Sequence, residues 1–429
     1  MDRRTTLAGA GSVLAVALAG CTEIGEGNDV PDGGSAPPGN DSEPTPDDDP
    51  VEFDVETVAE GFTNPWSIAF LPGRQLLVTE RDGDLKGVDR DDGSIAVVEG
   101  TPDVHTGGQG GMLDLAVSPG FPDERWVYLT YSAANDDGDT TTHLGRGWFV
   151  TDGGDSDDGF DDSDDGFDVD LDNPRFEEFE ELHAAKPFVN STQHYGSRVV
   201  FGEDGMVYVT VGDRGFKNFG PDHVSQDTAN ELGATLRLAP DGSIPEDNPF
   251  IGDPEVADSI FTYGHRNAQG MAVHPETGEI WQSEHGERDG DEINVVRGGE
   301  NYGWPVTHYG CEYGTDEPVG DEPHERDDVV PPVYFWECGS GGFPPAGATF
   351  YDGDAFEAWR GDLFVGTLAG EFLGRFLVES PGDPSVSEAD PVLDDRGWRI
   401  RDVAVAPDTG HLYVAVDDSD APIVRLVPA

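Results

Sequence analysis

Asp402-Val403-Ala404-Val405 begins the pattern that decides the fold, and the turn Asp408-Thr409-Gly410 and a second apolar run, Leu412-Tyr413-Val414, complete it. Two such runs around a Gly-containing turn are typical of a β-hairpin. The first run has five further copies: Ser67-Ile68-Ala69-Phe70, Asp114-Leu115-Ala116-Val117, Arg198-Val199-Val200-Phe201, Gly270-Met271-Ala272-Val273 and Gly347-Ala348-Thr349-Phe350. Hairpins that recur in this way predict the blades of a β-propeller.

The number and spacing of these copies predict one all-β domain, a six-bladed β-propeller over residues 51–429. Successive copies start 47, 84, 72, 77 and 55 residues apart, so the loops must carry insertions. The last copy ends close to the C-terminus, and we therefore expect the strand 51–58 to close the ring against the final blade. No segment has helical periodicity longer than a few turns.

The longest interval contains an acidic insertion, 152–172, with eleven Asp and no basic residue. Its heptad Asp155-Ser156-Asp157-Asp158-Gly159-Phe160-Asp161 is repeated at once as residues 162–168. We expect a solvated, disordered insertion. A loose cation-binding loop is the alternative, although the spacing lacks the Glu that an EF-hand requires at position 12.

The overall charge excludes most nucleic-acid ligands. Lys and Arg number 24 against 88 Asp and Glu, which gives a net charge of −64, and no basic run exceeds Arg3-Arg4. The 36% of hydrophobic residues still suffices for a large core. Such an acidic surface is typical of a protein that stays hydrated in molar salt, where charges are screened within about 3 Å, so we expect a halophilic protein.

The first 50 residues predict export. Arg3-Arg4 precede an apolar stretch, residues 7–20, which is too short to span a bilayer and is followed by Cys21. Residues 1–20 resemble a twin-arginine signal with a lipobox, which implies lipid attachment to Cys21 and an extracellular protein anchored on the outer face of the cell membrane. An ordinary signal peptide with an incidental Cys is the alternative. Residues 21–50, rich in Gly, Pro and Asp, predict a disordered tether.

Beyond Cys21 the chain has two cysteines, Cys311 and Cys338. Two thiols in an exported protein predict one disulfide. It would close a loop of 27 residues, worth about 3–4 kcal/mol by chain entropy.

Polar motifs fall in the loops that join the predicted blades, where a propeller presents its binding site. In chain order they are Gln109-Gly110-Gly111, Gln193-His194-Tyr195-Gly196-Ser197-Arg198, Tyr263-Gly264-His265-Arg266-Asn267-Ala268-Gln269-Gly270, Glu284-His285-Gly286-Glu287-Arg288-Asp289-Gly290-Asp291-Glu292-Ile293-Asn294, Gly299-Glu300-Asn301-Tyr302-Gly303-Trp304-Pro305 and Arg399-Ile400-Arg401-Asp402. Over the whole propeller, these motifs resemble the soluble pyrroloquinoline-quinone (PQQ) dependent aldose dehydrogenases, the glucose/sorbosone dehydrogenase family. The resemblance implies a six-bladed propeller that oxidises aldose sugars at C1 to lactones with PQQ and Ca²⁺, and passes the electrons to an external acceptor that the sequence does not identify.

The resemblance assigns the catalytic roles. His194 matches the family's base, which takes the proton of the C1 hydroxyl, and a histidine with a near-neutral pKa suits that step. Arg266 and Asn267 match the pair that polarises and orients the quinone. Gln109 and Gln193 lie where the family has polar residues that contact cofactor or substrate. Taken alone, a loop histidine is more often a surface residue.

Arg399 and Arg401 match the arginines that bind the PQQ carboxylates, and the planar guanidinium suits a carboxylate. Ion pairs with Asp402 or Asp417 are the alternative. Arg198 and Arg266 also fall within the motifs, and with these arginines we expect a small positive pocket for an anionic cofactor.

For calcium, the resemblance assigns Glu292, Tyr302 and the backbone carbonyls of Gly286 and Glu287, which are oxygen ligands. A structural calcium that holds a loop without touching the chemistry is equally consistent with this set.

The chain departs from the family pattern at three positions. Ala369 stands where the family has a lysine that contacts the cofactor. The absence of this lysine would weaken PQQ binding or lower the redox potential of the bound cofactor. His285 and Glu287 replace the more usual Gln and Pro. Two other functions stay open: a calcium-dependent propeller lactonase and a non-catalytic surface-binding propeller. We expect Trp66, Trp281 and Trp304 in the core between blades rather than as platforms for sugar.

Overall fold

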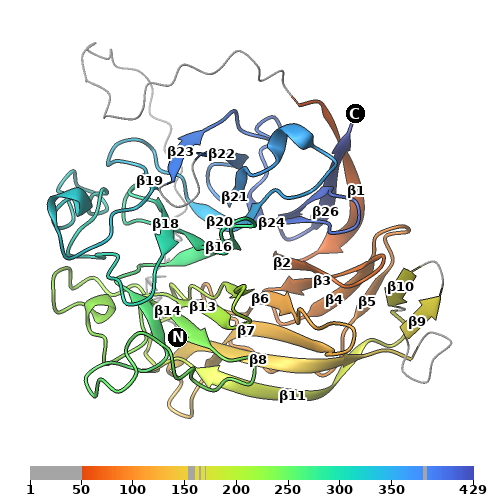
Figure 1. Ribbon diagram of the computed structural model, residues 1–429, viewed down its shortest axis with the longest axis horizontal. Helices are drawn as coiled ribbons and strands as arrows, with labels where there is room; N and C mark the ends of the chain where they lie inside the picture. The colour runs from red at the N-terminus through yellow and green to blue at the C-terminus, as the bar shows by residue number, and fades with distance from the viewer. Residues whose placement is uncertain (1–50, 153–159, 164–165, 170, 380–383) are drawn as a thin grey trace, which may run out of the picture. The chain divides into compact units, whose positions relative to one another are not determined.

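In the computed structural model, each of the six repeats forms the first strand of a four-stranded antiparallel sheet, one blade of a propeller (Figure 1). In chain order the blades are β2 (Pro65–Phe70), β3 (Gln75–Glu80), β4 (Leu85–Asp89) and β5 (Ile95–Val97); β6 (Met112–Val117), β7 (Trp126–Ala134), β8 (Thr140–Val150) and β11 (Arg175–Ala184); β12 (Val199–Phe201), β13 (Val207–Val211), β14 (Ala234–Leu238) and β15 (Ile260–Tyr263); β16 (Ala268–Val273), β17 (Ile280–Glu284), β18 (Glu292–Val296) and β19 (Tyr334–Phe335); β20 (Pro345–Phe350), β21 (Leu363–Thr367), β22 (Leu373–Glu379) and β23 (Ser385–Glu388); β24 (Ile400–Val405), β25 (Leu412–Val416), β26 (Ala421–Pro428) and β1 (Phe53–Phe62). The predicted all-β, six-bladed propeller is confirmed.

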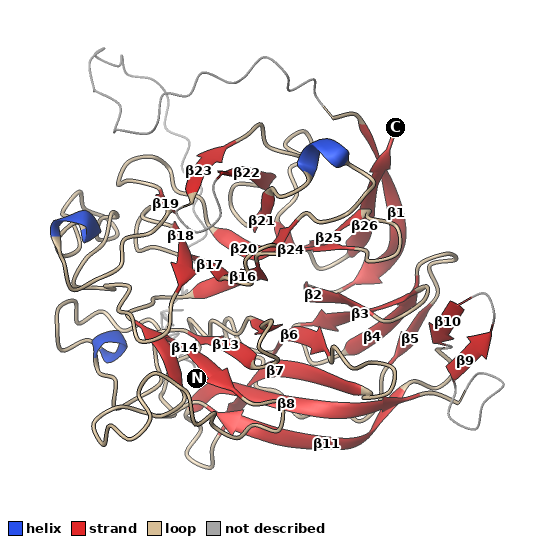
Figure 2. Cartoon of the chain, viewed as in Figure 1, coloured by secondary structure: helices blue, strands red, loops and turns tan. Residues whose placement is uncertain are grey.

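The structure describes residues 51–152, 160–163, 166–169, 171–379 and 384–429. The predicted export signal, 1–20, and tether, 21–50, lie outside these residues. In the described part of the chain, no helix has the length and apolar character needed to cross a membrane. Helix is limited there to three single 3₁₀ turns, Val224–Gln226, Pro323–Glu325 and Glu357–Trp359, which are blue in Figure 2.

The ring closes by pairing the two ends of the described chain. β1 pairs with β26 in antiparallel register, with Phe53 opposite Pro428, as predicted from the position of the last repeat. The inner strands β2, β6, β12, β16, β20 and β24 contact one another in that order, and β24 contacts β2. Figure 1 shows the labelled inner strands around the middle of the ring, with β11 at its outer edge.

Apolar side chains from neighbouring blades pack against each other between the sheets. One such cluster joins Phe62 and Val78 to Tyr413 and Ile423, so it holds the first blade against the last. The three tryptophans expected in the core, Trp66, Trp281 and Trp304, are 1–3% exposed. Burial of these large rings is confirmed.

β-Bulges at the start of the inner strands aim side chains into one mouth of the ring. The register is irregular between Pro65 and Ser67, between Ala268 and Gly270, and between Ile400 and Asp402. Because a bulge re-aims the side chain of its extra residue, three residues from distant blades meet. Arg401 donates from Nη1 to Gln269 Oε1 at 3.2 Å and lies 5.9 Å from the ring of Trp66.

The acidic insertion contains a hairpin. β9 (Phe160–Ser163) pairs with β10 (Gly166–Val169), with Phe160 opposite Val169. The expectation of a disordered insertion is wrong for these residues, because β9 and β10 pair as antiparallel strands. Val169 is buried against the core of the second blade.

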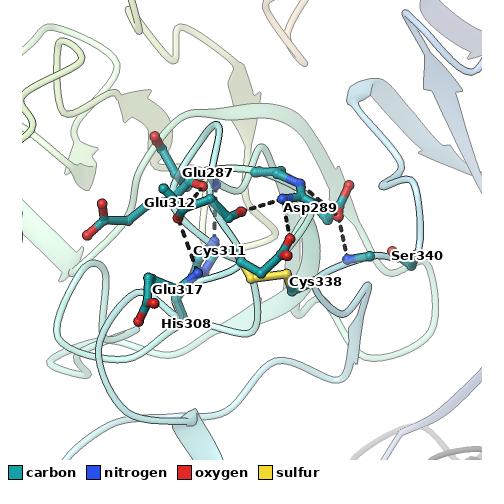
Figure 3. Close-up of a disulfide and its surroundings, with 12 residues drawn as sticks. Glu287, Asp289, His308, Cys311, Glu312, Glu317, Cys338 and Ser340 are labelled. Atoms are coloured by element: carbon teal, nitrogen blue, oxygen red, sulfur yellow. Dashed lines mark hydrogen bonds and ion pairs between the residues drawn. A yellow bond between two sulfur atoms is a disulfide. The ribbon is translucent and has the colours of Figure 1, made fainter. Parts of the chain in front are cut away.

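The predicted disulfide joins Cys311 to Cys338, with their Cα atoms 5.4 Å apart (Figure 3). Cys311 lies in the long connection between β18 and β19, and Cys338 follows β19. The bridge therefore fixes a loop that projects from the fourth blade.

Candidate active site

His194 lies in the loop between β11 and β12, and its backbone is in the left-handed region, with φ of 47°. Histidine is one of the few residues other than glycine that adopt this conformation with modest strain. The side-chain oxygen of Gln109 accepts the His194 backbone N–H at 2.7 Å. The structure thus brings two predicted site residues together, and it gives Gln109 a role in holding the His194 loop.

Asp213 orients the imidazole of His194. It follows β13, and its Oδ1 lies 2.6 Å from His194 Nδ1. The same carboxylate accepts the N–H of Gly215 at 2.7 Å and the indole N–H of Trp304 at 2.8 Å. With Nδ1–H donated to Asp213, Nε2 keeps the lone pair that a base needs.

Sequence reasoning missed Asp213. A signal was available, because Asp213 is the first charged residue after a buried strand that leads into a loop at the same mouth. The structure adds the pairing, which joins residues on different loops.

The electrostatic surroundings keep His194 neutral. Burial and the positive charge of Arg266 lower its pKa below the usual 6.5, although Asp213 opposes the shift. Burial raises the pKa of Asp213, but its interaction and hydrogen bond with His194 and the charge of Arg266 more than offset this effect, so its pKa is lowered. At pH 7 the pair is therefore a neutral imidazole beside a carboxylate.

Arg266 approaches the site from the loop between β15 and β16. It donates from Nη2 to Glu287 Oε2 at 2.8 Å and from Nη1 to the His285 carbonyl at 3.2 Å. Its guanidinium carbon lies 5.3 Å from the ring of Trp304. The Nε atom is buried and has no partner among the described residues.

Arg401 and Arg399 share one carboxylate. Arg401 Nη2 lies 2.8 Å from Asp417 Oδ2, and Arg399 Nη2 lies 3.4 Å from the same oxygen. The ion-pair alternative is therefore formed with Asp417 and not with Asp402. Arg401 is buried, and its Nε has no partner within the described chain, whereas the Arg399 side chain is 44% exposed.

Arg198 is not one of the pocket cations, which corrects the expectation from the motifs. Its Nη1 lies 3.1 Å from Asp114 and 2.9 Å from Asp402, and its guanidinium stacks 4.2 Å from the ring of Trp66. These carboxylates belong to the inner strands β6 and β24, so Arg198 ties the blades together below the mouth. Burial raises the pKa of Asp402 to about 6.

Three of the site residues described above lie around His285. Burial lowers its pKa well below 6.5, and Arg266, His194 and Arg401 add to the shift. His194 and Arg266 lie on loops and Arg401 lies on β24, so residues from different blades act on one point at the mouth.

Other predicted residues lie at the edge of this group. Asn267 accepts the N–H of Gly196 at 3.1 Å, next to the His194 loop. Gln193 is exposed and contributes its carbonyl, which accepts Arg214 Nε at 2.9 Å. Ala369 is exposed just after β21.

The predicted metal ligand Glu292 lies in a buried cluster of oxygens. It is opposite Glu284 across the β17–β18 pair, and Asn294 Nδ2 donates to both carboxylates, at 2.9 and 3.1 Å. Burial and the charge of Glu284 raise the pKa of Glu292 well above its usual value. The Asn294 Oδ1 atom is buried without a described partner. Sequence reasoning missed Glu284 as a member of this cluster.

The other predicted ligands are engaged in different contacts. The Tyr302 hydroxyl donates to the carbonyl of Val295 at 2.6 Å. The Glu287 carboxylate accepts a hydrogen bond from Arg266, and the Gly286 N–H donates to Asp291 Oδ1 at 2.9 Å. If these residues bind a cation, they do so through their backbone carbonyls.

The fold and these loops define a class of protein: a six-bladed propeller whose mouth gathers a buried histidine–carboxylate pair and buried arginines from separate blades. The chain belongs to the glucose/sorbosone dehydrogenase family, whose model matches residues 62–425. It is therefore an oxidoreductase of that family.

Among curated proteins, the chain is similar to the aldose sugar dehydrogenase YliI of Escherichia coli strain K12, with 34% identity over 380 residues that cover 87% of this chain and 93% of the relative. It is 27% identical over 429 residues to quinoprotein glucose dehydrogenase B of Acinetobacter calcoaceticus, which covers 85% of both chains. The solved apo form of the E. coli enzyme matches with a TM-score of 0.75 and 34% identity, over 88% of this chain and 100% of the other. The PQQ-bound form of an aldose sugar dehydrogenase from Streptomyces coelicolor matches with a TM-score of 0.66 and 25% identity, over 88% and 99%.

Proposed function

We propose that this protein oxidises aldose sugars at C1 to lactones, with PQQ as the hydride acceptor and Ca²⁺ as a second cofactor. The observation that carries the proposal is the convergence of the His194–Asp213 pair with two buried arginines that keep unpartnered donors. A base and an anion site side by side are what the oxidation of a sugar hydroxyl by an anionic quinone requires.

The residues at the mouth fit PQQ, which is a tricarboxylate. Arg266 and Arg401 each have a buried Nε–H without a described partner, and an arginine with spare donors binds a carboxylate in the plane of its fork. Arg399 adds an exposed cation beside Asp417. The loss of a lysine at Ala369 leaves these arginines as the groups that would hold the cofactor, together with Gln109, Gln193 and Asn267 at its edge.

The oxygens around Glu292 fit Ca²⁺. Two buried carboxylates face each other, and burial and the charge of Glu284 raise the pKa of Glu292. Asn294 Oδ1 adds a buried acceptor without a described partner, and such hard oxygens are the ligands that calcium prefers. Glu292 would bind through its carboxylate, and Tyr302, Gly286 and Glu287 through their backbone carbonyls.

The mechanism follows from the atoms at the mouth. When bound, PQQ supplies an ortho-quinone that accepts the hydride of C1. His194 Nε2 accepts the proton of the C1 hydroxyl as the C1–O bond gains carbonyl character. Asp213 keeps the imidazole in the required tautomer and stabilises the imidazolium that forms. Arg266, adjacent to the base and fixed by Glu287, supplies positive charge where negative charge develops.

Reconstitution with PQQ and Ca²⁺ tests this function directly. Purified protein should reduce an artificial electron dye in the presence of an aldose, and His194→Asn, which retains a residue that tolerates positive φ, should lose the activity while still binding PQQ. Absence of dye reduction with a broad aldose panel would reject the proposal. Lactone hydrolysis without quinone would support the lactonase alternative, and sugar binding without either reaction would support a binding propeller.

The cellular setting is a separate proposal. Export, lipid attachment to Cys21 and adaptation to high salt rest on the sequence of residues 1–50 and on the net charge of −64. Membrane fractionation of wild type against Cys21→Ser tests the anchor: the wild type should pellet with membranes, and the variant should appear in the soluble exported fraction.

A further inference from the structure

A buried arginine lies against the loop that carries His194. Arg214, in the loop after β13, is only 2% exposed. Its Nη2 donates to the carbonyl of Ser191 at 2.6 Å, and its Nε donates to the carbonyl of Gln193 at 2.9 Å. Its guanidinium carbon lies 3.8 Å from the centre of the Tyr195 ring. One side chain therefore contacts the chain on both sides of His194.

The same guanidinium is anchored to the second blade. Arg214 Nη1 donates to the carbonyl of Thr140 at 2.9 Å, and Nη2 donates to the Thr140 hydroxyl at 3.0 Å. Thr140 is the first residue of β8, the long strand labelled in Figure 1. In return, the Ser191 hydroxyl donates to the backbone carbonyl of Arg214 at 2.6 Å. Arg214 thus joins a strand of the second blade to the His194 loop.

The backbone is strained where these contacts are made. Three residues other than glycine are in the left-handed region there: His194 with φ of 47°, Ser197 with φ of 87° and Arg214 with φ of 59°. This conformation costs free energy for a residue with a side chain, and it persists only where surrounding contacts hold it. The contacts of Arg214 fall on the residues next to His194, so they hold the backbone of the base in this conformation.

The positive charge of Arg214 does not explain its position. Among the described residues, its hydrogen bonds all go to uncharged groups, namely three backbone carbonyls and one hydroxyl. Burial lowers the pKa of Arg214, and a buried cation with neutral partners is costly for stability. An arginine differs from a lysine in its planar fork of N–H donors, which can bind several oxygens in fixed directions. The role of Arg214 therefore lies in the geometry of this fork.

We propose that Arg214 is a positioning residue for the reaction: it fixes the backbone of the His194 loop, while the neighbouring Asp213 fixes the imidazole ring. Two consecutive residues thus hold the base, one through the main chain and one through the side chain. This inference rests on the proposed function, because it takes His194 as the base. Arg214 acts only through His194 and has no contact with the reacting atoms in this assignment.

The kinetic test uses Arg214→Lys, which keeps the charge and loses the fork, in the protein loaded with PQQ and Ca²⁺. Because a base displaced by about 1 Å can cost about 100-fold in rate, kcat should fall about 10- to 100-fold, while KM and the PQQ dissociation constant stay within about twofold of wild type. Arg90→Lys is the matched control, because Arg90 is a buried arginine outside the site that also donates to two backbone carbonyls, those of Gly73 and Arg74. This control should retain the wild-type kcat.

Ser191→Ala is a milder variant of the same test. It removes the hydroxyl that donates to the Arg214 carbonyl, and Ser191 is only partly buried, so this variant keeps the proposal testable if Arg214→Lys does not fold. From the net contribution of one hydrogen bond, kcat should fall about 2- to 10-fold. A wild-type kcat in Ser191→Ala and in folded Arg214→Lys would overturn the assignment.

A spectroscopic measurement separates this inference from the proposed reaction. The ¹⁵N shifts of histidine-labelled protein report which ring nitrogen carries the proton, and His194→Asn identifies the signals of His194. Wild type should show one tautomer, because Nδ1–H is donated to Asp213, whereas Arg214→Lys should show a mixture and Arg90→Lys should not.

The outcomes distinguish the two proposals. A mixture of tautomers in Arg214→Lys supports the positioning role even if no sugar is oxidised, in which case only the proposed function fails. Sugar oxidation with a wild-type kcat and a single tautomer in Arg214→Lys would leave the function standing and reject the positioning role. A single tautomer with equal losses of kcat and PQQ affinity would indicate a general structural role and would also overturn the assignment.

Discussion

Replacement of Asp213 by Asn tests the assignment of the base most directly. The carboxylate has two acceptor oxygens: Oδ1 receives His194 Nδ1–H and Gly215 N–H, and Oδ2 receives Trp304 Nε1–H. An amide has one acceptor oxygen, so its NH₂ group must face a donor on one of the two sides. A hydrogen bond to a charged group contributes about 1.5–3 kcal/mol, and 1.36 kcal/mol corresponds to a factor of ten in rate. We therefore expect Asp213→Asn to lower kcat/KM about 10- to 150-fold.

The same substitution should shift the acid limb of the pH profile of kcat/KM in a defined direction. The activity requires neutral His194, so kcat/KM falls as the pH drops through the pKa of this residue. Because the negative charge of Asp213 raises that pKa, its removal should move the acid limb to lower pH while the plateau falls.

The assay is steady-state dye reduction with the PQQ-loaded protein between pH 4 and 8, together with the PQQ dissociation constant and thermal unfolding. Glu231→Gln is the matched control, because Glu231 is a buried carboxylate that lies 2.8 Å from His183 and accepts a backbone N–H at 2.6 Å outside the site. Both variants should lose stability, but only Asp213→Asn should lose activity. A kcat/KM within about threefold of wild type, or an acid limb shifted to higher pH, would refute the role of Asp213.

Four further outcomes are expected. In wild type, the midpoint of the acid limb of kcat/KM should lie below pH 6.5, because burial and Arg266 lower the pKa of His194; a midpoint at or above 6.5 would contradict this. Arg401→Met should raise the PQQ dissociation constant about tenfold or more, measured by absorbance titration, whereas Arg74→Met at an exposed surface pair should leave it unchanged. Removal of Ca²⁺ by a chelator should lower the unfolding temperature, because Glu292, buried opposite Glu284, then loses the cation that would bind its carboxylate; Glu292→Gln should abolish this calcium dependence. The double variant Cys311→Ser/Cys338→Ser should lose about 3–4 kcal/mol of unfolding free energy relative to wild type, measured by denaturant unfolding.

The repeats predicted the architecture because a blade is a local object. Each hairpin is defined by residues within about 20 positions of one another, and alternation and turn residues encode it in the sequence. The closing strand, the disulfide and the buried tryptophans followed from the same kind of reasoning. The acidic insertion was misjudged because its composition predicted a solvated segment, while β9 and β10 pair in antiparallel register with Phe160 opposite Val169.

The candidate site was predicted in part. The motifs identified the segments that carry His194, Arg266 and Arg401. In the structure all three lie close enough to His285 to lower its pKa. Asp213 was missed, and Arg198 was wrongly counted as a pocket cation. Both errors concern pairing between separate loops or strands, which the sequence of a single segment does not reveal.

The sequence by itself determined the blade repeat, the order of the loops at the mouth, the thiols available for a bridge and the scarcity of basic residues. Only the tertiary structure decided which cations remain available to a ligand. Arg198 is neutralised by Asp114 and Asp402, which lie 84 and 204 positions away in the chain, whereas Arg266 and Arg401 keep unpartnered Nε atoms. The physical reason is that charge compensation depends on distances of a few ångströms across the ring, and those distances are set by closure of the propeller and by the bulges of its inner strands.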